Sequence, residues 1–116
     1  MDFPLGKLLE LDVEKTQSPD HQDRVVLTRG DFQFFPSSGL ITVRQGDALD
    51  LDSEDVFVPF GDGDVELTLK AVNQPGNPIS LGSIFLRRDE VNVGELSKRF
   101  EGGGALYDVK YKVLPP

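Results

Sequence analysis

Turn-forming residues are spread over the whole chain, and this feature constrains the fold more than any other. The 116 residues include 12 glycines and 8 prolines, without an internal repeat or a low-complexity linker. Glycine supplies positive φ angles and proline presets φ to about −65°, so each cluster of these residues bends the chain. Turns that recur about every eight to twelve residues are typical of an all-β sandwich or barrel.

Between these turns, apolar and polar residues alternate with a period of two. The alternation is clearest in residues 9–13, 65–69 and 107–113. Such a pattern places one set of side chains on a buried sheet face and the other set in water. Five further strands are predicted, at about residues 24–28, 31–35, 40–44, 55–60 and 82–87. Eight short strands predict an all-β, eight-stranded antiparallel sandwich, formed as a single domain over residues 1–116.

One segment has a different spacing. Apolar residues in 92–100 recur at roughly helical intervals, and the flanking Gly94 and Gly103 leave room for about two turns, which predicts a short helical connector. The three glycines at 102–104 precede a strand pattern and not a helix. They therefore predict a hairpin connection, because a phosphate-binding loop needs a helix N-terminus behind it.

The charge of the chain is acidic and unevenly placed. Twelve Lys and Arg residues against 20 Asp and Glu residues give a formal net charge of −8, which argues against a nucleic-acid partner. Residues 45–69 hold eight acids and no base, while the rest of the chain is balanced. Cysteine is absent, which excludes disulfides and thiolate sites and favours an intracellular, cytoplasmic protein.

The acidic stretch invites a metal hypothesis. Asp50 and Asp52 begin a run with oxygen ligands at alternate positions, as hard cations prefer. As a calcium loop of the helix–loop–helix type the run fails, because its sixth position is Asp55 and its twelfth is Gly61. The stretch is therefore interpreted as a solvated acidic loop, without a metal site or a cofactor.

A catalytic site is not predicted, so the chain is not expected to be an enzyme. The only histidine, His21, lies between Asp20 and Asp23, but no serine lies in a Gly-x-Ser-x-Gly elbow. A carboxylate pair of the kind that hydrolyses glycosides would need buried acids, and nothing in the pattern marks two of them as buried.

The aromatic residues suggest a contact surface. Tyr107 and Tyr111 share one strand face and are predicted to be core residues whose hydroxyls reach the rim. Phe32, Phe34 and Phe35 cannot all point to one face, so at least one is expected to be exposed. Phe34 and Phe35 are the predicted anchors for a protein partner or a membrane; the alternative is edge packing under a loop.

Several segments together resemble C2 domains. Asp23-Arg24-Val25-Val26-Leu27, followed by Gly30-Asp31 and Gln33-Phe34, resembles the second-to-third strand signature, with Arg24 and Val25 in place of the usual Pro-Tyr. Residues 64–72, the loop at 73–81 and Gly82-Ser83-Ile84-Phe85-Leu86 resemble the later strand–loop–strand pattern. Residues 104–114 resemble the closing strand, so that the resemblance covers nearly the whole chain.

The resemblance implies a calcium site between the loops at one end of the sandwich. Asp20 and Asp23 stand near the acidic positions of the first such loop, whereas the later loop, residues 73–80, contains no carboxylate. Because the number of charged ligands tunes calcium affinity, the resemblance implies a degenerate, calcium-independent C2 domain. If metal is bound after all, Asp20, Asp23, Asp50 and Asp52 are the expected ligands.

Lipid binding in this family uses a lysine-rich concave face, which the chain lacks. Its nearest basic clusters are Arg87-Arg88 and Lys98-Arg99. Each basic residue near an anionic surface contributes about 1 kcal/mol, and the net charge of −8 opposes this attraction.

The favoured function is therefore a non-catalytic protein-interaction module, a scaffold domain of a cytoskeletal or membrane-trafficking protein. We expect it to be the N-terminal domain of a longer protein. One alternative is a peripheral membrane-targeting module that uses Phe34, Phe35, Arg87 and Arg88. A second is an extracellular carbohydrate-binding β-sandwich with Tyr107 or Tyr111 exposed for sugar stacking.

Overall fold

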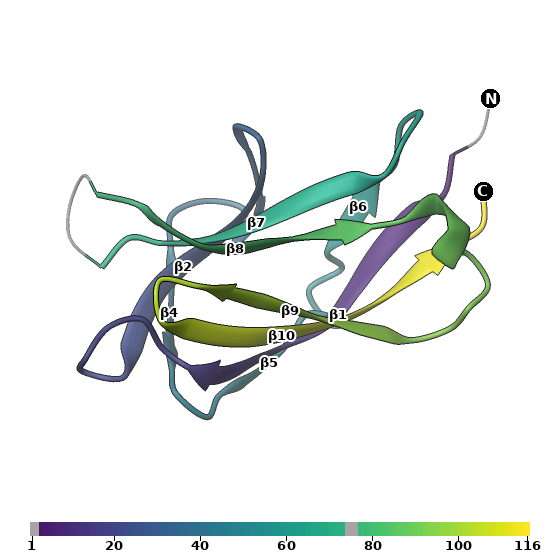
Figure 1. Cartoon of the computed structure of the whole chain (residues 1–116). Helices are drawn as coiled ribbons and strands as arrows, with labels where there is room; N and C mark the ends of the chain where they lie inside the picture. Colours follow the sequence, from purple (N-terminus) through teal and green to yellow (C-terminus); the bar gives the residue numbers. More distant parts are fainter. Residues whose placement is uncertain (1–2, 74–76) are drawn as a thin grey trace.

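Alternating apolar residues build two antiparallel sheets in this computed structural model, which describes residues 3–73 and 77–116. The first sheet contains β1 (Leu5–Lys15), β5 (Ala48–Asp50), β6 (Phe57–Pro59), β9 (Leu96–Gly102) and β10 (Ala105–Leu114). The second sheet contains β2 (Gln22–Arg29), β3 (Phe32–Phe35), β4 (Ile41–Arg44), β7 (Val65–Ala71) and β8 (Ile79–Leu86). Figure 1 shows β7 and β8 in one layer above β9 and β10 in the other.

Each sheet has one edge that is divided between two short strands. In the first sheet the order is β5-β1-β10-β9, and β6 pairs with the same β1 beside β5. In the second sheet the order is β3-β2-β7-β8, and β4 pairs with the same β2 beside β3. The sheets stack with β8 next to β9, so the divided edges lie together on the opposite side of the sandwich.

The core lies between the sheets and follows from the alternation. Along β10 every second residue is buried, from Ala105 to Val113, and Tyr107 and Tyr111 are fully buried in this row. Val65, Leu67 and Leu69 of β7 supply the facing layer. Burying a side chain of this size contributes about 1.5–3 kcal/mol, so the shared core is what holds the two sheets together.

Backbone contact closes the sandwich at β8 and β9. Gly82 has a φ of +114°, and a Cβ there would lie 2.6 Å from the backbone nitrogen of Glu101. A Cβ at Gly102 would lie 3.0 Å from the carbonyl carbon of Leu81. Glycine is needed at Gly82 for both reasons, since other residues rarely adopt this φ and have no room for a side chain.

The predicted fold class is confirmed: all ladders between the strands are antiparallel, and the two sheets form a sandwich. The structure nevertheless contains ten strands in its described residues, not eight. The added ones are β5, which lies in the acidic stretch, and β9. No helix within residues 3–73 and 77–116 is long and apolar enough to cross a membrane.

The predicted helical connector at residues 92–100 is wrong. Most of it belongs to β9, which pairs with β10 from Leu96 to Gly102, and Gly103 and Gly104 form the predicted hairpin turn. The inward row of β9 is Leu96, Lys98, Phe100 and Gly102, so a lysine interrupts its apolar alternation. A 3-10 turn, Arg88–Glu90, lies just before this segment. Residues 74–76 of the later C2-type loop lie outside the described residues.

Candidate partner-binding groove

An open groove of about 780 Å³ lies where the divided edges of the two sheets meet. One wall is formed by β3 and the residues after it, and the other by β6 and the residues before it. The lining residues are Arg29, Phe32, Gln33, Phe34, Phe35, Pro36, Ser37, Glu54, Asp55, Val56, Phe57 and Pro59. The groove thus joins segments that lie far apart in the sequence.

The surface of the groove is dominated by phenylalanine rings. Phe32 is 63% exposed and Phe57 is 38% exposed, whereas Phe34 and Phe35 are half-buried and pack against the core. The rings of Phe32 and Phe34 meet edge to face, with centroids 4.9 Å apart at an interplanar angle of 66°. Such a pair fixes the orientation of Phe32, so that an exposed ring is held in a defined position.

Charged residues lie at the rim of the groove. Arg29 donates a hydrogen bond from its guanidinium to the Pro59 carbonyl oxygen at 2.8 Å, which links the second sheet to the first. Glu54 and Asp55 are exposed beside the aromatic wall. The Lys7 ammonium lies 5.6 Å from the centroid of the Phe57 ring and forms an ion pair with Asp52 at 2.7 Å.

The predicted anchors Phe34 and Phe35 both line this groove. The expectation that at least one of the three phenylalanines is exposed is confirmed, and the exposed one is Phe32. Sequence reasoning missed Phe57, although the alternation of Val56, Val58 and Phe60 as buried residues would have placed Phe57 on the outside.

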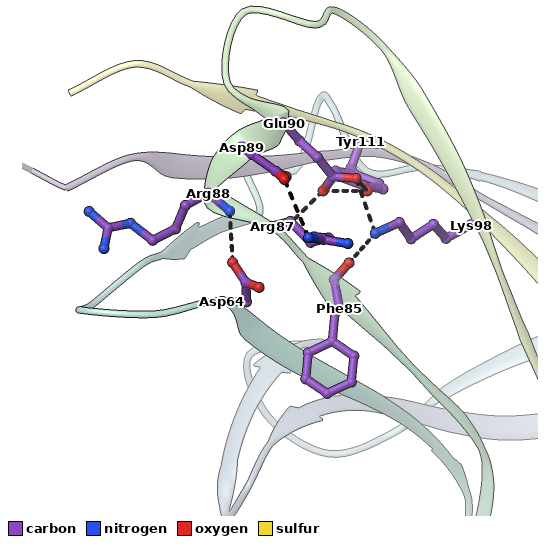
Figure 2. A network of polar contacts seen from close by, with 8 residues as sticks. All are labelled: Asp64, Phe85, Arg87, Arg88, Asp89, Glu90, Lys98 and Tyr111. Atoms are coloured by element: carbon purple, nitrogen blue, oxygen red, sulfur yellow. Dashed lines mark hydrogen bonds and ion pairs between the residues drawn. The ribbon is translucent and has the colours of Figure 1, made fainter.

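Arg87 and Arg88 lie elsewhere and do not line the groove with Phe34 and Phe35. They stand in the turn after β8 (Figure 2), where the Arg88 guanidinium donates to the Asp62 carbonyl oxygen at 2.9 Å. The Arg88 backbone N–H donates to Asp64 Oδ1 at 2.9 Å. The structure therefore does not combine the two phenylalanines and the two arginines in one surface pocket.

The carboxylate of Glu90 connects this turn to the residues around it (Figure 2). It accepts hydrogen bonds from the Arg87 backbone N–H at 2.8 Å and from the Tyr111 hydroxyl at 2.8 Å. It also forms an ion pair with Lys98 at 3.1 Å, and Lys98 donates to the Phe85 carbonyl oxygen. Burial alone would raise the pKa of Glu90, but these three partners outweigh it and lower the pKa. The arrangement anchors the turn to β9 and β10.

Asp23 has a structural role at the opposite end of the sandwich. It is fully buried, and its two oxygens accept hydrogen bonds from four donors. These are the backbone N–H of Gln17 at 2.8 Å and of Ser18 at 3.0 Å, the Asn73 amide at 3.0 Å and the Tyr107 hydroxyl at 2.6 Å. Burial, followed by the bond to Asp23, raises the pKa of Tyr107, which keeps the phenol a donor.

The other carboxylates expected in the case of metal binding are also engaged. Asp20 accepts from the Ser18 hydroxyl at 2.6 Å and from the Gln22 backbone N–H at 3.2 Å. Asp50 accepts from the Ser53 backbone N–H at 3.2 Å, and Asp52 pairs with Lys7. Within residues 3–73 and 77–116, no group of three or more His, Asp or Glu residues is arranged to hold a metal ion.

The rings of Tyr107 and Tyr111 are fully buried, as the strand pattern predicts. Their hydroxyls reach Asp23 and Glu90 and their faces are covered by the core. They consequently offer no surface on which a sugar ring could stack, which removes the form of the carbohydrate-binding hypothesis that depends on them.

Comparison with known proteins gives only distant structural similarity. No protein-family model matches the chain, and no curated protein matches it either. Among solved structures, the chain is similar to a C2 domain of plant extended synaptotagmin 1, with a TM-score of 0.49 and 12% identity over 97% of this chain and 94% of that one. It is also similar to the Drosophila C2-DSL-EGF1 structure, with a TM-score of 0.44 and 12% identity over 97% of this chain and 68% of that one. Both are C2 domain structures, the family that the sequence resembles, and we draw nothing about function from them.

Proposed function

We propose that this chain is a non-catalytic protein-interaction module whose partner binds in the groove between β3 and β6. The observation that carries the proposal is the exposed aromatic surface formed by Phe32 and Phe57 where the two sheet edges meet. Exposed aromatic rings held in a well-defined position are typical of the residues that dominate binding energy at protein interfaces.

The charges at the groove favour a protein partner over a membrane. Glu54 and Asp55 at the rim repel anionic lipid headgroups, and the net charge of −8 adds to this repulsion. Arg87 and Arg88, the basic pair that a membrane-targeting module would use, do not line the groove. The second candidate is a peripheral membrane function, which the exposed Phe32 ring supports.

Site-specific photo-crosslinking tests the proposal. A photoreactive phenylalanine analogue is placed at Phe32 in one protein and at Phe85 in a second, since Phe85 is 51% exposed on β8 and lies outside the groove. We expect protein adducts in a lysate of the source cells from position 32, and their loss when Phe57→Ser is added. Equal adducts from both positions, or adducts only with added anionic vesicles, would contradict the proposal.

A further inference from the structure

Half of the residues that line the groove bear rings. Six of the twelve are phenylalanine or proline, and Phe32 and Phe57 belong to strands of different sheets. Flat, rigid surfaces of this kind bind other ring-bearing or apolar side chains without much loss of conformational entropy. The groove is open to solvent, so it suits a segment that lies across the surface.

The two strand edges at the groove are poor templates for an added strand. β3 has four residues with an irregular register against β2, and Pro36 follows it. β6 has three residues, the last of which is Pro59. Proline has no N–H to donate, and short, irregular edges offer few backbone hydrogen bonds. A peptide in this groove must therefore be recognised mainly through its side chains and its own preformed shape.

The electrostatic character of the groove selects a cation. Glu54 and Asp55 line it, and they belong to the stretch of residues 45–69, which holds eight acids and no base. One base, Arg29, also lines the groove and donates to the Pro59 carbonyl oxygen, so two acids and one base leave the lining with a net charge of −1. Lys7 does not line the groove, and its ammonium lies 5.6 Å from the centroid of the Phe57 ring.

From these three features we propose that the groove binds a proline-rich segment in the polyproline II conformation that carries an arginine or lysine. Polyproline II makes no internal hydrogen bonds and is already extended before it binds, so it needs no strand edge. Its prolines would lie against Phe32, Phe34 and Phe57, and its cation would lie at Glu54 and Asp55. This mode of recognition uses aromatic-lined grooves in general. The inference rests on the proposed function, because it names the class of partner for the same groove.

Three matched peptide-display libraries test the inference against the 116-residue chain. The first has the form Arg-x-x-Pro-x-x-Pro, the second replaces Arg by Glu, and the third replaces both prolines by glycine. We expect enrichment from the first library only. A peptide selected from it is then titrated into the ¹⁵N-labelled protein, where the largest NMR shifts are expected at Phe32, Glu54 and Phe57.

Substitutions of two exposed phenylalanines, one in the groove and one outside it, separate the groove from the rest of the surface. Phe57→Ser should weaken binding of the selected peptide roughly tenfold, whereas Phe85→Ser should leave it within about twofold. Glu54→Lys should weaken it roughly two- to fivefold, as expected for an exposed charge pair. Circular dichroism confirms that each variant is folded, and Phe32→Ser replaces Phe57→Ser if the latter unfolds.

Each outcome decides the question. Enrichment from the Glu library or the glycine library equal to that from the first library, no enrichment at all, or equal effects of Phe57→Ser and Phe85→Ser would overturn the inference. If position 32 still crosslinks to a protein in those cases, the proposed function stands and only the class of partner is wrong. If position 32 crosslinks to no protein, the proposed function itself fails.

Discussion

The bond between Tyr107 and Asp23 allows a quantitative test of how this sandwich is held together. The substitution Tyr107→Phe removes the hydroxyl that donates to Asp23 Oδ2 at 2.6 Å and keeps the ring in the core. Oδ2 then retains the Gln17 backbone N–H at 2.8 Å, and Oδ1 keeps its two donors. The perturbation is therefore confined to one hydrogen bond.

A hydrogen bond to a charged group contributes about 1.5–3 kcal/mol to the free energy of unfolding. The entropy of unfolding is about 2.1 cal/mol/K per residue, which for 116 residues gives about 0.24 kcal/mol/K. The midpoint of thermal unfolding should consequently fall by about 6–12 °C. No large cavity is created, because only an oxygen atom is removed from a fully buried ring.

Urea and thermal denaturation, followed by circular dichroism, measure this change. The single variants Tyr107→Phe and Asp23→Asn and the double variant form a cycle, in which we expect a coupling energy of about 1 kcal/mol or more. A destabilisation below about 0.5 kcal/mol for Tyr107→Phe, or additive effects in the double variant, would refute the role given to this bond.

Three further predictions concern calcium, pH and backbone packing. Millimolar calcium should leave the unfolding midpoint within about 1 °C of its value in chelator, because Asp20 and Asp23 already accept hydrogen bonds from donors of the protein. A calcium site in the presence of calcium at about 100 times its Kd would instead add about 2.7 kcal/mol to the free energy of unfolding. The pKa of Glu90 is lowered in the folded state, so its contribution to stability is present above the unfolded value of 4.5 and is lost as pH falls through the lower folded pKa. Urea denaturation between about pH 5 and 3 should therefore show a flatter decline for Glu90→Gln than for the wild type, and equal slopes would contradict this. Gly82→Ala should destabilise the protein by about 3 kcal/mol or more and Gly39→Ala by about 1–2 kcal/mol. Both glycines have a positive φ, but of the two only Gly82 lacks space for a Cβ. Equal losses of stability in urea denaturation would refute the packing argument.

The core could be predicted from the sequence because its signal is local. Alternation alone placed Tyr107 and Tyr111 on one buried face and identified β1, β7 and β10. The signal failed at β9, where Lys98 takes an inward position and is satisfied by Glu90 and by the Phe85 carbonyl. A buried-face lysine can be explained only when its partners from other parts of the chain are known.

The candidate groove could be predicted only in part. Phe34 and Phe35 were found because three phenylalanines in four residues cannot share one face. That Phe57 and Glu54 complete the same surface depends on the pairing of β6 with β1 and of β3 with β2, which no local pattern encodes. For the same reason Asp23 resembled a metal ligand, although donors from the preceding turn at residues 17–18 and from the distant residues 73 and 107 occupy its oxygens.

The two sides of the sandwich, where the edges of its sheets lie together, should diverge unequally in evolution. Where β8 meets β9, backbone lies against backbone, and a single Cβ at Gly82 would collide with Glu101. Between β3 and β6 lies an open groove lined in part by aromatic side chains, which can be exchanged for others of similar size. Related chains can therefore change the surface on this side while the seam between β8 and β9, and with it the spacing of the sheets, stays fixed.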